Sequence, residues 1–215
     1  IVLVSYLGQT RWTRTANPLL AMKQAVAVPS VRVVSLAGLL TIFAMFGVLI
    51  FVAVWLQQSN LAGPAKSGLL ISIPGLVGIF CAPAAGLLGD KVGDFWVVIG
   101  GIIVFVAGGM GLLALPDTIG VYPIFLLLIG IGVACMMTNV GAMALSIRPD
   151  LRHAVSGVFN GSRFFGGILA PLVLTPVYEA VSIKGVLLVI ILVSIAVGVV
   201  LRVGGLSSSE PENRV

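Results

Sequence analysis

The stretch VVSLAGLLTIFAMFGVLIFVAVWL at residues 33–56 decides the fold class of this chain. It has no charged residue, and an α-helix of this length, rising about 1.5 Å per residue, spans about 30 Å of hydrocarbon. Stretches of similar length and composition, each without acidic residues, follow at 67–88, 95–115, 122–145, 154–177 and 185–203. The sequence therefore predicts an all-α, polytopic membrane protein with six transmembrane helices.

Bulk composition excludes the soluble classes. Hydrophobic residues make up 59% of the 215 residues and charged residues 9%, and the mean hydropathy is +1.20, far above the range of soluble domains. We predict three regions. Residues 1–32 form a cytoplasmic linker after the end of a preceding span, residues 33–203 form the six-helix bundle, and residues 204–215 form a polar, disordered cytoplasmic tail.

Basic residues are distributed unevenly between the two sides that this topology defines. The side that carries both termini receives nine of them: Arg11, Arg14, Lys23, Arg32, Lys91, Arg148, Arg152, Arg202 and Arg214. The opposite side receives only Lys66 and Lys184. The positive-inside rule then places both termini in the cytoplasm of a plasma-membrane protein. The net charge of +5 is scattered over helix ends, which argues against nucleic-acid binding.

Glycine and proline within the stretches indicate close helix packing and bends. Small residues four apart, which let helix backbones approach in lipid, occur at Ala107/Gly111, Gly130/Ala134 and Gly157/Gly161. Bends are expected at Pro74, Pro83, Pro171 and Pro176, which lack a backbone donor.

The joint between the second and third stretches carries a motif, GLLGDKVGD at residues 86–94. We expect Gly86 to end one helix, Asp90 to lie in a tight turn and Gly93 to precede the next helix. The pattern resembles the G-x-x-x-D-[RK]-x-G loop signature of the major facilitator superfamily. The resemblance implies that Gly86, Asp90, Lys91 and Gly93 form a cytoplasmic gate latch. A plain helix-terminating turn is the alternative, and Asp94 departs from the basic residue usual there.

Further segments resemble the same family, over residues 17–202. The PLL at residues 18–20 is similar to the lead into the carboxyl half of its drug and metabolite exporters. Residues 148–171, RPDLRHAVSGVFNGSRFFGGILAP, resemble the penultimate helix with its R-x-x-G-G core. The resemblance implies a carboxyl-terminal six-helix half that exports a drug or metabolite, driven by an ion gradient such as that of protons. The implied partner is an amino-terminal six-helix half or a second subunit.

Polar residues inside the spans are candidates for contact with a small-molecule solute. Arg163 lies near the bilayer midplane, where charge is costly and points to function. Ser156, Asn160, Arg163 and Gly167 share one helix face. Asn139 lies at a depth similar to Asn160, so the two could hydrogen-bond. Asn139, Asn160 and Arg163 are the predicted cavity-lining residues, with a polar clamp between helices as the alternative.

The residue types that are missing also limit the function. The six stretches contain no Asp or Glu, so a proton site would lie in another half or subunit. Neither a nucleotide loop nor an HExxH or GxSxG motif occurs, and we expect no enzymatic activity, cofactor or metal. Two other functions stay open: uptake of an anionic nutrient with Arg163 as counter-ion, and a non-transporting regulatory or remnant membrane protein.

Overall fold

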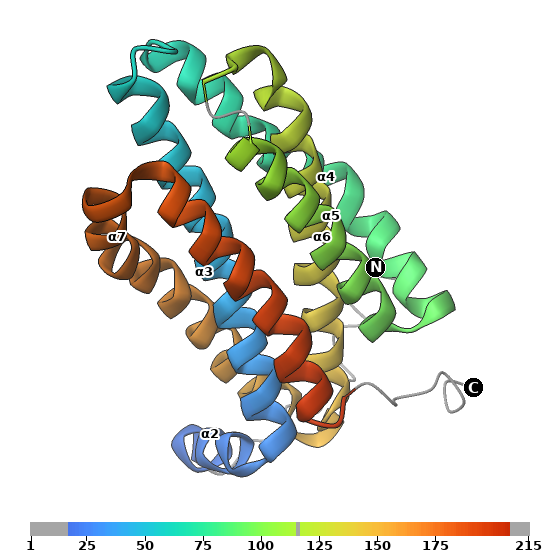
Figure 1. Ribbon diagram of the computed structural model, residues 1–215. Coiled ribbons are helices and arrows are strands. Elements are labelled where there is room, and N and C mark those ends of the chain that lie inside the picture. Colours follow the sequence, from blue (N-terminus) through green and yellow to red (C-terminus); the bar gives the residue numbers. More distant parts are fainter. Residues whose placement is uncertain (1–16, 115–116, 207–215) are drawn as a thin grey trace, which may run out of the picture.

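The computed structural model describes residues 17–114 and 117–206, which are helical and contain no strand (Figure 1). The elements are α2 (Pro18–Ala27), α3 (Pro29–Gln58), α4 (Pro64–Val92), α5 (Asp94–Ala114), η1 (Ile119–Val121), α6 (Tyr122–Ser146), η2 (Pro149–Leu151) and α7 (Arg152–Val203). The all-α prediction is confirmed. The predicted end of a preceding span and residues 207–215 of the predicted tail lie outside the described residues.

Five helical segments of the described chain are long and apolar enough to cross a membrane, against six stretches predicted. The difference lies in α7, whose 52 residues would extend about 78 Å if straight. The backbone leaves the helical region at Ser182, with φ 68° and ψ −168°. The chain turns back there, and the arms 152–181 and 183–203 run in opposite directions (Figure 1). The last two predicted stretches fall on these two arms.

Glycine allows close helix contacts at several crossings. A Cβ on Gly101 of α5 would lie 2.9 Å from the carbonyl oxygen of Gly132 in α6, and a Cβ on Gly130 would lie 2.8 Å from Cα of Pro74 in α4. The predicted packing role of Gly130 is therefore confirmed. Gly157 and Gly161 have nothing within 4 Å of such a Cβ, so the prediction that they pack against a helix is wrong within the described chain.

The helices differ in how much of their surface the bundle covers. The main contacts join α3 to α7, and both α4 and α5 to α6. About half of the most apolar window of α3 is buried, but only 17% of that of α4. Outward-facing apolar side chains on α4 include Leu69, Leu76 and Phe80, of which Phe80 is 78% exposed. Such a face must meet lipid or another protein surface.

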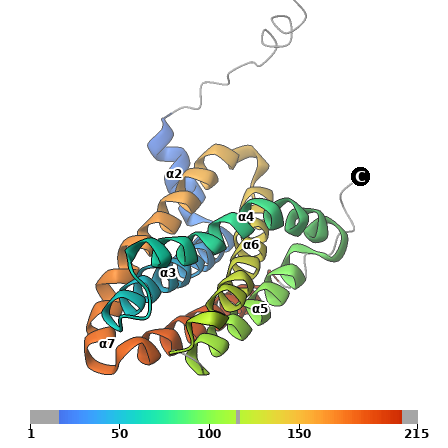
Figure 2. The same cartoon turned by 90° about the horizontal axis from the view of Figure 1, so that it is seen from above.

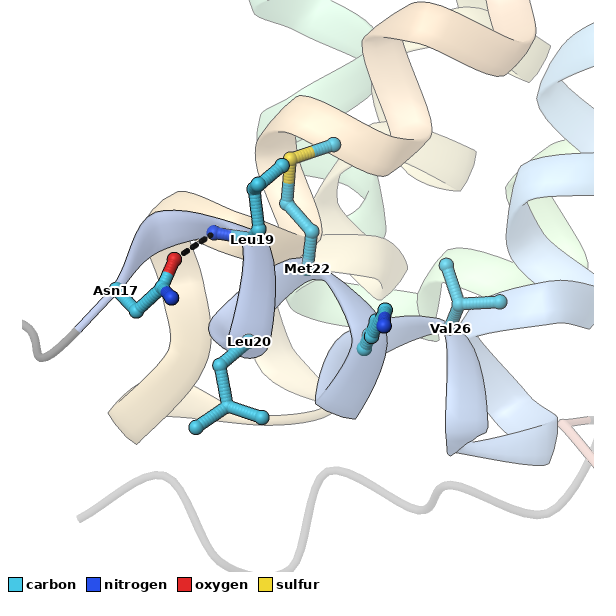
Figure 3. Close-up of a pocket in the computed structure, with 6 residues that line it drawn as sticks. Asn17, Leu19, Leu20, Met22 and Val26 are labelled. Atoms are coloured by element: carbon cyan, nitrogen blue, oxygen red, sulfur yellow. Dashed lines mark hydrogen bonds between the residues drawn. The ribbon is translucent and has the colours of Figure 1, made fainter.

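The short helix α2 lies across one end of the bundle (Figure 1 and Figure 2). The side chain of Asn17 caps it by accepting a hydrogen bond from the backbone amide of Leu19 at 3.2 Å (Figure 3). Ala25 is buried in a small cluster with Val31 and Val155, which docks α2 on α3 and α7. The groove drawn in Figure 3 is lined by Asn17 and residues of α2 only, so it is a surface feature of one helix.

Candidate central cavity

A cavity of about 490 Å³ lies between four helices. Its lining residues are Met45 of α3, Pro74, Gly75, Gly78, Ile79 and Ala82 of α4, Gly130, Val133, Ala134, Met137 and Thr138 of α6, and Arg163 of α7. These positions lie close to the middle of α3, α4, α6 and the first arm of α7. This volume lies within the 300–1,000 Å³ that ligand pockets commonly occupy, and the cavity is open to the surface on the side where Ile79 is exposed.

Among the described residues, Arg163 is the only charged one that lines this cavity. Its Nε is buried and has no hydrogen-bond partner, and its terminal nitrogen donates a long hydrogen bond of 3.4 Å to Oδ1 of Asn160. The guanidinium carbon lies 5.4 Å from the centre of the Phe159 ring, a distance that permits a cation–π interaction. Arg163 has no acidic partner within residues 17–114 and 117–206, where the neighbouring joint holds the ion pair Arg148–Asp150 at 2.6 Å.

The predicted polar face on α7 is present. Asn160 Nδ2 donates to the backbone oxygen of Ser156 at 2.9 Å and to its hydroxyl oxygen at 3.2 Å, and Oδ1 of the same amide accepts from Arg163. Ser156, Asn160 and Arg163 thus form one chain of hydrogen bonds along the helix. This arrangement holds the amide oxygen of Asn160 toward the guanidinium.

The predicted hydrogen bond between Asn139 and Asn160 is wrong. Asn139 is fully buried, and its Nδ2 donates to the backbone oxygens of Ala85 at 3.3 Å and Cys135 at 2.8 Å. The amide therefore joins α6 to the end of α4, which is the helix-clamp alternative. Asn139 is also absent from the cavity lining, although the neighbouring Thr138 belongs to it.

Two residues beneath Arg163 were not predicted from the sequence. A Cβ on Gly38 of α3 would lie 2.6 Å from the Phe159 ring and 3.0 Å from Cγ of Arg163, so the absence of a side chain at 38 makes room for both. The spacing of Phe159 and Arg163, four residues apart on a helix, is a signal that could have paired them. Nothing in the local sequence marks Gly38, because its role depends on the packing of α3 against α7.

The predicted latch loop is much shorter in the structure than expected. Helix α4 continues through Gly86, Asp90 and Lys91 to Val92, and α5 begins at Asp94, so Gly93 alone joins them. The expectation that Gly86 ends the helix is wrong, since the helical hydrogen bonds continue to the amide of Gly93, which donates to Gly89 at 2.9 Å. Asp90 and Lys91 are exposed in the last turn of α4.

Gly89, which the motif reading passed over, has the tightest surroundings in this joint. A Cβ there would collide with Oδ1 of Asn139 and would lie 2.6 Å from Oδ1 of Asp94. At Gly86 the nearest atom would be Cγ2 of Thr138 at 3.5 Å, an ordinary contact. The close approach of α4, α5 and α6 thus depends on Gly89 and the side chain of Asn139.

Gly93 adopts a backbone conformation that favours glycine, with φ 94°. We expect Gly93→Ala to lower the free energy of unfolding by about 1 kcal/mol, because L-residues are disfavoured at positive φ. Gly86→Ala is the matched control, since it adds the same methyl at a helical position with space. Thermal unfolding of both purified variants measures the difference, and equal melting temperatures would contradict the role of Gly93.

Comparison with known proteins identifies the family. The model of the Major Facilitator Superfamily matches residues 8–171, which is most of the chain. The chain belongs to the Major Facilitator Superfamily. Among curated relatives, the Multidrug resistance protein B homolog of Mycobacterium tuberculosis is 27% identical over 176 residues, 78% of this chain and 32% of that protein. The Tetracenomycin C resistance and export protein of Streptomyces glaucescens is 26% identical over 176 residues, 80% of this chain and 32% of that protein.

A solved structure shows the same fold. The crystal structure of an auto-inhibited POT family peptide transporter superposes with a TM-score of 0.68, at 17% sequence identity, over 84% of this chain and 38% of that one. The chain spans about a third of the length of the curated relatives it matches. As a family member with apolar helices of spanning length, it is a multi-pass membrane protein of a transporter family, and its relatives are named for multidrug resistance and export.

Proposed function

We propose that this chain is the carboxyl-terminal six-helix half of a secondary transporter that exports a drug or metabolite by alternating access. The cavity carries the proposal, because it lies at mid-height of four helices. Superfamily transporters bind substrate near the bilayer midplane, at the interface of their repeats. The two arms of α7 supply the fifth and sixth crossings. Uptake of an anionic nutrient is a second candidate, which the unpaired charge of Arg163 supports.

The proposed partner is an amino-terminal six-helix half or a second subunit that covers α4 and the first arm of α7. Large apolar side chains are exposed on both helices, among them Ile79, Phe80, Phe164 and Phe165. Gly157 and Gly161 leave space for another backbone on α7. The length of the relatives, about three times the matched region, leaves sequence for such a half.

The proposed orientation has both termini in the cytoplasm of the cell membrane. Lys91 lies at the end of α4 and Arg202 at the end of α7. Gly204, which follows α7, packs against Val33 near the start of α3. The ends of α4 and α7 and the start of α3 therefore share one side of the bundle. Lys66 lies at the opposite end of α4. This agrees with the positive-inside rule and puts the exposed carboxylate of Asp90 on the cytoplasmic side, as a gate latch requires.

Coupling to a proton gradient would need an acidic group from outside the described residues. Four of the described acidic residues lie at helix ends or in joints: Asp90, Asp94, Asp117 and Asp150. The fifth, Glu179, lies near the end of the first arm of α7. None lines the cavity. A titratable group at membrane depth is the usual proton relay, so we place it in the amino-terminal half.

Filling the cavity tests the proposed function. Everted membrane vesicles from cells that express the full polypeptide are energised and offered a panel of antibacterial compounds that includes tetracenomycin C. We expect accumulation of at least one compound, and we expect Gly78→Phe to reduce it at least about tenfold, because the cavity no longer holds a drug-sized molecule. Nothing lies within 4 Å of a Cβ at Gly78, so the backbone at this position leaves room for a side chain to start into the cavity.

Gly68→Phe is the matched control for that experiment. It adds the same side chain to the same helix, also with nothing within 4 Å of its Cβ, and it does not line the cavity. Transport should therefore be retained. Failure of every compound to accumulate, or equal transport by the wild type and Gly78→Phe, would overturn the proposed function.

A further inference from the structure

The lining of the cavity is apolar except at two side chains. Its walls are apolar side chains and glycine or proline backbone, apart from the hydroxyl of Thr138 and the guanidinium of Arg163. The apolar part of a ligand can pack anywhere along such walls. A charged group on the ligand is favoured at one place only, where Arg163 meets the cavity.

The charge of Arg163 is not neutralised by the described chain. A guanidinium has five N–H donors. Here one terminal nitrogen reaches Asn160 at 3.4 Å, and Nε is buried without an acceptor. The Phe159 ring covers one face of the guanidinium, which stabilises the cation but satisfies no N–H donor. A buried charge without partners is costly, and an anionic partner offsets that cost.

Resting on the proposed function, we propose that the cavity takes amphipathic organic monoanions whose carboxylate binds Arg163 and whose apolar body packs against α4 and α6. A carboxylate matches the planar donors of a guanidinium in a paired, two-bond geometry. Asn160 contributes by accepting from one guanidinium nitrogen, which orients the remaining donors. The apolar body contacts Ile79, Val133 and Met137.

Binding of three probes with the same naphthyl ring and different charge tests the charge preference. The full polypeptide, purified from its native membrane, is placed in nanodiscs of uncharged phosphatidylcholine and titrated calorimetrically with 2-naphthoate, 2-naphthamide and 2-naphthylmethylammonium. We expect naphthoate to bind at least about tenfold more tightly than the amide, as charge-assisted hydrogen bonds exceed neutral ones by this order. The ammonium should bind most weakly.

Substitutions at Arg163 show whether this residue is responsible. Arg163→Gln keeps a polar side chain without the charge and should make naphthoate and naphthamide bind equally. Arg163→Lys keeps the charge but not the paired geometry, so part of the preference should remain. Gly78→Phe should remove binding of all three probes.

Each result bears on one of the two proposals. Equal binding of anion and amide by the wild type would overturn the proposed ligand class, as would a preference that survives in Arg163→Gln. An acidic residue from the rest of the polypeptide, paired with Arg163, would give the first of these results. If Gly78→Phe still blocks binding, the cavity and the proposed function stand. Absence of binding by all probes would overturn the proposed ligand class, and full binding by Gly78→Phe would overturn the cavity as the place where they bind; the vesicle experiment decides the proposed function separately.

Discussion

Arg163→Ala is expected to abolish transport while the protein remains folded in the membrane. The side chain supplies the only charge among the described residues that line the cavity, and hydrogen bonds to a charged group are worth about 1.5–3 kcal/mol. Removing them should weaken substrate binding about 10- to 100-fold. Initial transport rates in everted vesicles, at a substrate concentration below half-saturation for the wild type, measure the effect.

The control for this result separates loss of the contact from loss of the protein. Arg163→Lys retains the charge and should keep measurable transport, and the membrane content of both variants is compared by immunoblot. The alanine variant also removes an aliphatic stem that packs on Gly38, so its melting temperature is measured alongside. Transport by Arg163→Ala at the normal rate would show that the cavity assignment is wrong.

Gly166→Ala is expected to destabilise the bundle strongly. Gly166 is buried on α7, and a Cβ there would overlap the carbonyl oxygen of Leu39 in α3. Backbone cannot rotate away as a side chain can, so the two helices must separate. Overpacking of this kind costs up to about 3 kcal/mol. A lower melting temperature and a reduced yield of monodisperse protein in size-exclusion chromatography report the effect.

Gly100→Ala in α5 provides the comparison. It introduces the same methyl where nothing lies within 4 Å, so the melting temperature should be unchanged. Leu39 is adjacent to Gly38, which packs against Arg163, so Gly166→Ala should also reduce transport by the protein that remains folded. Equal stability of Gly166→Ala and Gly100→Ala would contradict the close α3–α7 crossing.

The membrane class and the family could be read from the sequence because both depend on local patterns. Apolar length determines whether a helix can span hydrocarbon, and the GLLGDKVGD motif is contiguous. The break between the fifth and sixth stretches, at residues 178–184, was predicted in the same way, and the reversal in α7 lies within it at Ser182. The sequence did not predict which residue turns the chain. Ser182 adopts the positive φ, and neither it nor its two neighbours is the glycine or proline that usually marks a turn.

The candidate site was predicted in part. The chain of polar residues from Ser156 to Arg163 follows from helical spacing, and the structure contains it. Asn139 was assigned to the same patch by its depth alone. Depth does not specify rotation about the helix axis, and the structure turns Asn139 toward Ala85 of α4. Gly38 and Gly89 could not be recognised, because each makes room for side chains of other helices.

The sequence by itself determined that the chain is a bundle of apolar helices of the Major Facilitator Superfamily, with one charged residue, Arg163, away from the ends of the predicted spans. These properties depend on composition, spacing and contiguous motifs. Only the tertiary structure decided that α3, α4, α6 and α7 line an open cavity, that Arg163 reaches it with a donor unsatisfied, and that Asn139 clamps two helices instead. Helix rotation and crossing distance are set by contacts between residues far apart in the chain, where a missing Cβ determines how closely two backbones approach.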